Sequence, residues 1–151
     1  KRDLELFCEL SEKGFALGTD FITGHPGESE AIWQEAYAML EKFPLTHVHA
    51  FTYSKRDKTP SASMKPQIQG NIAKERLKCL EALVAEKNLA FRQKNASVPL
   101  DILVEEEHSG IFSGYDQFFN KIFIHSKRDL LKEWVRINAY DVQKEANVAY
   151  L

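Results

Sequence analysis

The sequence predicts a parallel α/β unit followed by a small antiparallel β-barrel. In residues 15–53 an apolar run, a helical pattern and a second apolar run follow one another with short connections. This order is typical of a β-α-β unit with parallel strands. After residue 99 the pattern changes to about five short alternating segments, as in small barrels. We therefore expect two domains, residues 1–97 and residues 98–151.

The composition is that of a soluble globular protein. The chain has 151 residues, of which 44% are hydrophobic and 28% are charged, and its net charge is −2. This length can bury a sizeable core, and the charge gives no global signal for nucleic-acid binding. Because the sequence shows no apolar run of membrane-spanning length and no signal peptide, we expect a cytoplasmic protein without membrane contact.

The two cysteines, Cys8 and Cys79, lie far apart, and each falls within a helical pattern. Neither has a Cys-x-x-Cys or similar spacing, so the sequence predicts no disulfide framework and no zinc or iron–sulfur site. We expect both to be reduced and at least half-buried. The chain starts at Lys1 within a helical pattern and without an initiator methionine, which suggests a fragment of a longer protein.

The first domain begins with a helix and a strand. Residues 2–13 have a helical pattern, and Gly14 follows as a left-handed C-cap. Residues 15–23 form an apolar run of strand length, which we expect to be buried. Asp20 in such a strand needs a hydrogen-bond partner.

A glycine turn connects this strand to the next helix. Gly24 and Gly27 permit positive φ close to a ligand, and Pro26 restricts the turn. The helix is predicted over about residues 29–42, with Ser29 as its N-cap. Its apolar face is predicted from helical spacing to comprise Ile32, Ala36, Met39, Leu40 and Phe43. Turns of this kind form ligand sites at the carboxyl ends of parallel strands; an ordinary connecting loop is the alternative.

The second strand, residues 47–53, leads into a polar loop at residues 54–69. The strand is rich in β-branched and aromatic residues, and the loop contains two prolines. Lys55, Arg56 and Lys58 follow the strand end, where phosphate contact is plausible. We favour Arg56 because a guanidinium binds phosphate or carboxylate bidentately.

A long helix is predicted over about residues 71–94, and residues 95–99 are typical of a linker. Residues 55–94 contain ten Lys and Arg against four acidic residues. For residues 74–94 we expect these charges to lie on a solvated helix face.

The second domain is predicted to consist of short strands. Their ranges are about 100–107, 113–119, 121–125, 133–141 and 146–151. Residues 98–151 have a net charge of −3, so bulk charge does not draw this domain to RNA. Tyr115, Phe118 and Phe119 are predicted as exposed aromatic residues on which bases can stack, although as many or more would fill the barrel.

Several motifs, in order, resemble the C-terminal half of the radical SAM methylthiotransferases. Residues 19–29 read TDFITGHPGES, and the family pattern is TDFIVGFPGET. Residues 51–62 resemble the family's F-x-YS-x-R-x-GT-x-A segment, with Lys58 in place of its glycine. This loop therefore cannot rely on a freely accessible positive φ there. Residues 64–67 and 74–77 match a downstream M-x-x-Q and a KERL helix, and the tail resembles the RNA-binding TRAM domain.

The resemblance implies that residues 1–97 end a partial (βα)6 radical SAM barrel and that residues 98–151 form a TRAM or OB-like barrel. It implies a parent enzyme that uses S-adenosyl-L-methionine and two [4Fe–4S] clusters to add a methylthio group to a modified tRNA adenosine or a ribosomal protein. The loop and tail are closest to the branch acting on threonylcarbamoyladenosine next to the anticodon. The family's cluster-binding cysteines are absent from these residues, so we expect the chain alone to be inactive.

The resemblance also implies site residues. Seven would lie near S-adenosyl-L-methionine, namely Phe21, Ile22, Thr23, Gly24, Phe51, Tyr53 and Ser54. Barrel packing is the alternative for Phe21, Ile22 and Phe51. Six would contact tRNA or substrate, namely Lys55, Arg56, Lys58, Tyr115, Phe118 and Phe119. No catalytic or metal-ligating residue is predicted.

Two functions of other classes remain open from the sequence. The chain can act only as an RNA-binding module, with steep salt dependence. It can also be a structural half-barrel whose open sheet edges pair with a second copy.

Overall fold

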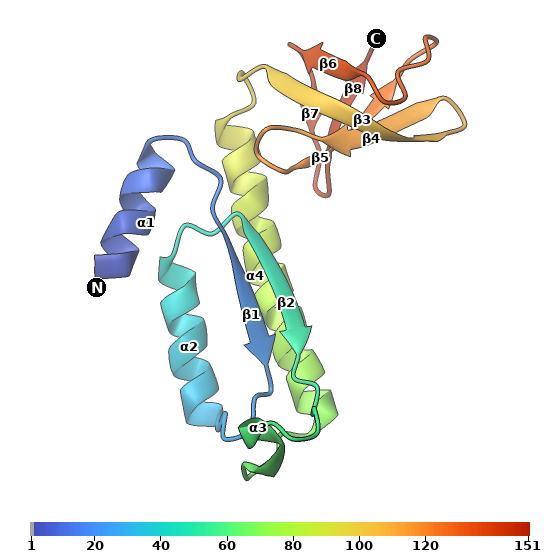
Figure 1. Cartoon of the computed structure of the whole chain (residues 1–151). Coiled ribbons are helices and arrows are strands. Elements are labelled where there is room, and N and C mark those ends of the chain that lie inside the picture. The colour runs from blue at the N-terminus through green and yellow to red at the C-terminus, as the bar shows by residue number, and fades with distance from the viewer. Residues whose placement is uncertain (1) are drawn as a thin grey trace. The chain divides into compact units, whose positions relative to one another are not determined.

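The computed structural model describes residues 2–151, which form two compact units (Figure 1). The first unit ends at Asn88, and the second comprises Leu89–Leu151. Helix α4 (Gly70–Lys94) contributes its last residues to the second unit. The domain boundary predicted after residue 97 stays a prediction.

The first unit contains the predicted β-α-β unit. Its elements before α4 are α1 (Arg2–Glu12), β1 (Gly18–Thr23), α2 (Glu30–Lys42), β2 (His47–Thr52) and the short α3 (Pro60–Ser63). Strands β1 and β2 are parallel, with Gly18 opposite His47 and Thr23 opposite Thr52. Among the described residues each of these strands pairs along one edge only, so each keeps an open edge. The larger barrel that the resemblance implies stays a prediction.

Local signals in the sequence explain where these elements begin and end. Gly14 has a φ of +87°, and Phe15 N donates to Leu10 O at 3.1 Å, which ends α1 in the predicted left-handed C-cap. The Ser29 hydroxyl accepts from Ile32 N at 3.3 Å, which confirms Ser29 as the N-cap of α2.

The alternation of side chains gives the β1–β2 sheet two different faces. One face packs on a buried cluster from α2 and α4, formed by Trp33, Leu80 and Val84 and contacted by Phe21, Tyr37, Leu40, Val48 and Ala50. The opposite face exposes Asp20, Ile22, His49 and Phe51. The packed face fixes the sheet, and the exposed face is available for a ligand or for further protein.

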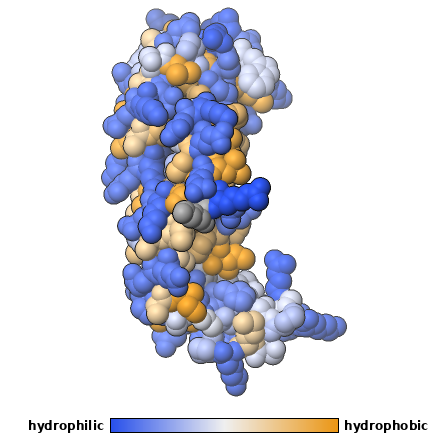
Figure 2. Space-filling view, turned by 90° about the vertical axis from the view of Figure 1, so that its left-hand side faces the viewer, coloured by the Kyte–Doolittle hydropathy of each residue, from blue (hydrophilic) through white to orange (hydrophobic). Residues whose placement is uncertain are grey.

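The apolar face predicted for α2 is wrong in its centre. Trp33 is the buried residue of this helix, whereas Ile32 and Met39 are 53% and 47% exposed. The stripe of Trp33, Tyr37 and Leu40, which is also at helical spacing, meets the sheet instead. Figure 2, which views the side that carries α1 and α2, shows hydrophobic patches among hydrophilic residues.

Two further expectations for the first unit are wrong. Asp20 lies on the exposed sheet face, where its carboxylate approaches His49 Nδ1 at 3.4 Å, and it is not in a buried strand. Cys79 is exposed on the outer side of α4, although Cys8 is half-buried as expected.

The second unit is a curled mixed sheet. Its strands are β3 (Leu100–His108), β4 (Ile111–Tyr115), β5 (Lys121–His125), β6 (Trp134–Ile137), β7 (Asp141–Val142) and β8 (Asn147–Tyr150). They lie in the order β6-β3-β4-β5-β8-β7. The predicted all-antiparallel arrangement is wrong at one position, because β8 runs parallel to β5. After β6, which lies at one edge of the sheet, the chain continues to β7 at the opposite edge. The single strand predicted at 133–141 is therefore divided into β6 and β7.

The core of the second unit lies on one face of this sheet. It consists of Leu100, Ile102, Val104, Phe112, Ile122, Ile124, Leu130, Ile137 and Ala149. The apolar residues alternate along β3 and β5, as the sequence pattern predicts for half-buried strands.

Candidate functional site

The carboxyl ends of β1 and β2 lie side by side. Tyr53 N donates to Thr23 O at 2.8 Å, and the rings of Tyr53 and His25 meet edge to face with their centroids 5.4 Å apart. The glycine turn after β1 and the polar loop after β2 therefore meet at one edge of the sheet. This adjacency is the arrangement that a ligand site built from both strand ends requires.

An ion pair with little exposure holds the glycine turn in place. Glu28 Oε2 accepts from Gly24 N at 2.7 Å and from Arg76 Nη1 at 2.6 Å. The side chains of Arg76 and Glu28 are 6% and 10% exposed. Because one carboxylate joins the turn to α4, the position of the Gly24 backbone depends on Arg76.

Arg76 lies inside the first unit, so the solvated face predicted for residues 74–94 is wrong at this position. Its Nη2 donates to Glu30 at 2.9 Å, and its guanidinium lies 5.6 Å from the centre of the Trp33 ring. Burial tends to lower the pKa of Arg76, but hydrogen bonds to Glu30 and Glu28 outweigh burial and raise its pKa. The pKa of Glu30 is lowered by its hydrogen bonds with Gln34 and then Arg76.

Arg92 is a second exception to the solvated face, in the second unit. It is 3% exposed and donates to the carbonyl oxygens of Gln143 at 2.7 Å and Lys144 at 2.8 Å. Burial lowers the pKa of Arg92. Its contacts fix the turn between β7 and β8.

The end of β1 packs directly against α4. Gly24 has a φ of +77°, and a Cβ at this position would lie 2.5 Å from the Cβ of Ala73. The Thr23 hydroxyl is buried and donates to Ala73 O at 3.0 Å. Thr23 therefore holds the strand to the helix, and Gly24 allows the close approach.

The residues predicted near S-adenosyl-L-methionine divide between the two faces of the sheet. Ile22 and Phe51 are 52% and 45% exposed and occupy opposite positions on the exposed face. Phe21 lies on the packed face, 6.5 Å from the Trp33 ring, which is the packing alternative. Ser54 is exposed at the strand end.

Tyr53 adds a polar group to this strand end. Its side chain is half-buried, and its hydroxyl is buried without a hydrogen-bond partner in the described chain. A buried hydroxyl of this kind is available to a ligand that reaches the strand end.

The three basic residues of the loop after β2, Lys55, Arg56 and Lys58, are exposed. Lys58 adopts a φ of +65°, so the loop has a positive φ here although this conformation is not freely accessible to a lysine. The Thr59 hydroxyl donates to Arg56 O at 2.7 Å and closes the turn that contains Lys58. The loop keeps its glycine-like conformation at the cost of strain in a lysine.

Two of the three aromatic residues predicted for base stacking are exposed. Tyr115 and Phe119 stack on each other with ring centres 4.8 Å apart and an interplanar angle of 16°. The exposure predicted for Phe118 is wrong: it is half-buried against the core and meets Phe91 edge to face at 5.4 Å. The hairpin turn directs it inward because Asp116 accepts from Phe118 N at 2.9 Å.

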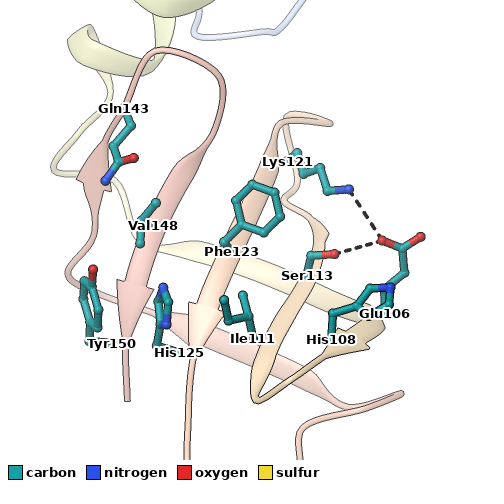
Figure 3. Close-up of a pocket in the computed structure, with 10 residues that line it drawn as sticks. All are labelled: Glu106, His108, Ile111, Ser113, Lys121, Phe123, His125, Gln143, Val148 and Tyr150. Atoms are coloured by element: carbon teal, nitrogen blue, oxygen red, sulfur yellow. Dashed lines mark hydrogen bonds and ion pairs between the residues drawn. The ribbon is translucent and has the colours of Figure 1, made fainter.

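Sequence reasoning missed a pocket on the sheet of the second unit (Figure 3). It has a volume of about 480 Å³, and its lining includes a second aromatic pair, His125 and Tyr150. The alternation of Lys121, Phe123 and His125 on β5 was a signal for one such face. The partner Tyr150 could not be predicted, because nothing local shows that β8 pairs with β5.

Residues 2–151 contain neither an arrangement of metal ligands nor a membrane-spanning helix. No group of three or more His, Cys, Asp or Glu there is arranged to hold a metal ion. Within the same residues no helix is both long and apolar enough to cross a bilayer.

The chain resembles curated proteins along its whole length, although no family model matches it. It is 44% identical over 151 residues to a putative methylthiotransferase of Helicobacter pylori strain J99, covering 99% of this chain and 36% of that protein. It is 29% identical over 148 residues to the threonylcarbamoyladenosine tRNA methylthiotransferase of Bacillus subtilis, covering 91% of this chain and 33% of that protein.

A third relative matches a shorter segment. The threonylcarbamoyladenosine tRNA methylthiotransferase of Aquifex aeolicus is 38% identical over 100 residues, covering 66% of this chain and 24% of that protein. The chain thus spans about a third of the length of the curated relatives that it matches over its whole extent. These relatives are methylthiotransferases, and the chain matches a segment of about that length in them.

Proposed function

We propose that this chain is the C-terminal part of a radical SAM methylthiotransferase that modifies an adenosine next to the anticodon of a tRNA. Within that family we assign it to the threonylcarbamoyladenosine branch. The relatives that carry this substrate in their names support the assignment. The structural observation that supports this proposal most directly is that the carboxyl ends of β1 and β2 are adjacent, since Tyr53 N donates to Thr23 O.

The exposed sheet face supports a place for S-adenosyl-L-methionine. Ile22 and Phe51 offer apolar contact for an adenine ring beside the glycine turn. Tyr53, with its unpartnered buried hydroxyl, and the exposed Ser54 offer hydrogen bonds at the strand end. When bound, this cofactor would supply the methyl group and the radical chemistry of the family, and the residues named here would hold and orient it.

The iron–sulfur clusters do not fit residues of this chain. Its two cysteines are Cys8, half-buried in α1, and Cys79, exposed on α4, and the described residues offer no ligand group. We therefore place all cluster ligands in parts of the parent outside these 151 residues, and we expect the isolated chain to be inactive.

For tRNA we propose two contact regions, one in each unit. The exposed loop with Lys55, Arg56 and Lys58 would bind phosphate groups near the cofactor face. The stacked pair Tyr115 and Phe119 would contact unpaired bases. Phe118 is left out of this set because it packs on the core.

Complementation with the full-length parent tests the proposal. The parent is expressed in a bacterial strain that lacks its own methylthiotransferases for tRNA and for the ribosomal protein, and the nucleosides of total tRNA are measured by mass spectrometry. The mass of the ribosomal protein is measured in the same cells. We expect a methylthio group on threonylcarbamoyladenosine. A methylthio group only on dimethylallyladenosine or only on the ribosomal protein would contradict the branch, and none on any of the three would contradict the function.

A matched pair of variants tests the cofactor face. Phe51→Ala should lower the affinity of the reconstituted parent for S-adenosyl-L-methionine about tenfold, because an aromatic contact with adenine is lost. Phe15→Ala removes a ring that is 57% exposed and precedes β1, and it should leave this affinity unchanged. Equal affinities in the two variants would remove Phe51 from the site.

A further inference from the structure

The pocket on the sheet of the second unit has the components of a base-binding site. Its volume of about 480 Å³ is sufficient for a nucleobase with its sugar. The side chains that line it come from β3, β4, β5 and β8 and from Gln143 in the turn after β7, on the opposite face of the sheet from the core (Figure 3). These strands are held in place by the hydrophobic core beneath them, so the side chains are presented by a fixed scaffold.

Aromatic rings line one side of this sheet pocket. His125 and Tyr150 are neighbours in the β5–β8 register and stack with ring centres 4.7 Å apart and an interplanar angle of 11°. Tyr150 is 67% exposed, whereas His125 and Phe123 are half-buried. One face of the Tyr150 ring is thus supported by His125, and its remaining exposed surface is available to a planar ligand.

Polar groups line the other side. Glu106 Oε2 accepts from the Ser113 hydroxyl at 3.0 Å and lies 3.5 Å from Lys121 Nζ. The Lys121 ammonium also lies 5.4 Å from the centre of the Phe123 ring. A ligand between the two sides therefore meets rings, one cation and one carboxylate, which suits a base with hydrogen-bonding edges better than a purely apolar molecule.

The charge of the second unit indicates whether an RNA would be bound there mainly through its bases or mainly through its phosphates. Residues 89–151 contain eight Lys and Arg against nine Asp and Glu, and Lys121 in the pocket is paired with Glu106. Such a surface neutralises few phosphates, so electrostatic attraction contributes little to binding. Stacking on aromatic side chains does not need a basic surface.

We propose that the sheet pocket binds one unpaired base of a single-stranded RNA segment, which contacts the rings of Tyr150 and Phe123. This inference rests on the proposed function, because a tRNA offers unpaired bases in its loops. It places a second stacking site in the unit, in addition to the pair Tyr115 and Phe119. Because the contact is made to the base, the part of the affinity that depends on Tyr150 should change little with salt.

The test is fluorescence anisotropy with the 151-residue chain and a labelled single-stranded RNA of ten nucleotides, compared with the same strand in a blunt duplex. We expect the single strand to bind more tightly than the duplex. Tyr150→Ala should weaken binding of the single strand about tenfold, and Tyr150→Phe should retain it, because the ring and not the hydroxyl makes the contact. Phe123→Leu, which keeps an apolar side chain, gives a second and independent loss.

Trp134→Ala is the matched control, since Trp134 is a 73% exposed aromatic residue of β6 outside the pocket lining. Unchanged thermal unfolding of each variant shows that the sheet is intact. Wild-type affinity in both Tyr150→Ala and Phe123→Leu would overturn the proposal. So would preference for the duplex, or a loss of affinity in Tyr150→Ala that disappears as the salt concentration is raised. No binding of the single strand would also overturn it, and is the result expected if the pocket receives a protein segment.

Failure of this inference differs from failure of the proposed function. The methylthio product is measured with the full-length parent and tRNA, whereas the pocket is measured with this chain and a short RNA. If the parent makes the product while Tyr150→Ala binds the short RNA normally, only the pocket assignment fails. If the product is absent while the pocket variants lose RNA binding, only the methylthiotransferase proposal fails.

Discussion

The guanidinium of Arg76 and the carboxylate of Glu28 form an ion pair that connects the middle of the first unit to its glycine turn. Arg76 Nη1 lies 2.6 Å from Glu28 Oε2 and 2.9 Å from Glu28 O, across 48 positions of sequence. The same Oε2 accepts from Gly24 N. The turn at the proposed cofactor face is therefore held by a charge pair that is removed from water.

Arg76→Met should destabilise the chain by about 3 kcal/mol, because it leaves the Glu28 carboxylate in a poorly hydrated site without its partner. The free energy of unfolding is measured by urea denaturation. Glu30→Gln is the control, since the Glu30 side chain is 67% exposed and its bond to the same guanidinium is screened by water, so that its loss should cost much less. Similar losses in the two variants would contradict the special position of Glu28.

Gly24→Ala and Gly27→Ala should differ in their cost, although both glycines have positive φ. Gly27 has a φ of +87° with open space around it, so alanine there should cost about 1–2 kcal/mol for the left-handed conformation alone. At Gly24 the new Cβ also meets Ala73 at 2.5 Å, which should make the loss larger by about 1–3 kcal/mol. In the Ala73→Gly background the difference between the two sites should shrink; a persistent difference would contradict the clash.

The β-α-β unit could be predicted because its signals are local. Ser29 lies between a glycine turn and a helical pattern, and it marks the start of α2. Gly14 follows the first helical pattern and marks the end of α1, so both boundaries are encoded within a few residues. The choice of the buried stripe was harder, since Ile32 and Trp33 compete for the same side of α2 and only the shape of the sheet decides between them.

The spacing of residues along α4 indicated that Arg76 is buried, but the count of charged residues in 74–94 favoured a solvated face. Arg76 is in helical phase with Ala73, Leu80 and Val84, which are all buried. Its partner Glu28 is distant in sequence, so the periodicity alone could not show how the charge is compensated. The parallel pairing of β5 with β8, and with it the sheet pocket, depends on a crossing connection that no local pattern specifies.

Lys58→Gly should stabilise the chain by about 0.5–1 kcal/mol. Lys58 has a φ of +65°, which is strained for a residue with a Cβ, and the gain from relieving this strain exceeds the entropy that glycine loses on folding. Lys55→Gly is the control, because Lys55 is exposed in the same loop but is not among the described residues at positive φ. It should give no gain in the midpoint of thermal unfolding; equal gains would assign the effect to lost charge.

The open edges of β1 and β2 predict self-association of the isolated chain at high concentration. Size-exclusion chromatography with light scattering should show a mass above 17.3 kDa that rises with loading. The full-length parent, in which we expect further strands to cover these edges, serves as the comparison. A single monomer peak for the isolated chain at millimolar concentration would remove the prediction.

Tyr140 should make the second unit sensitive to alkaline pH. Its hydroxyl lies 2.9 Å from Asn95 O and 3.0 Å from Val98 O, and burial, followed by the Asp116 charge, raises its pKa above 10.0. Since the folded state holds this proton more tightly than the unfolded state, the stabilisation is complete below about pH 10 and is lost as pH rises towards the folded-state pKa.

Tyr140→Phe should cost about 1 kcal/mol at pH 8, from the lost hydrogen bond. Its free energy of unfolding should then fall less steeply than that of the wild type between pH 9 and pH 11. Tyr37, whose pKa is also raised by burial, remains in both proteins, so the difference between the two curves reports Tyr140 alone. If the free energies of unfolding of the two proteins ran parallel over this range, the Tyr140 hydroxyl would titrate alike in the folded and unfolded chain. Its hydrogen bonds to Asn95 O and Val98 O would then contribute nothing to the pH response.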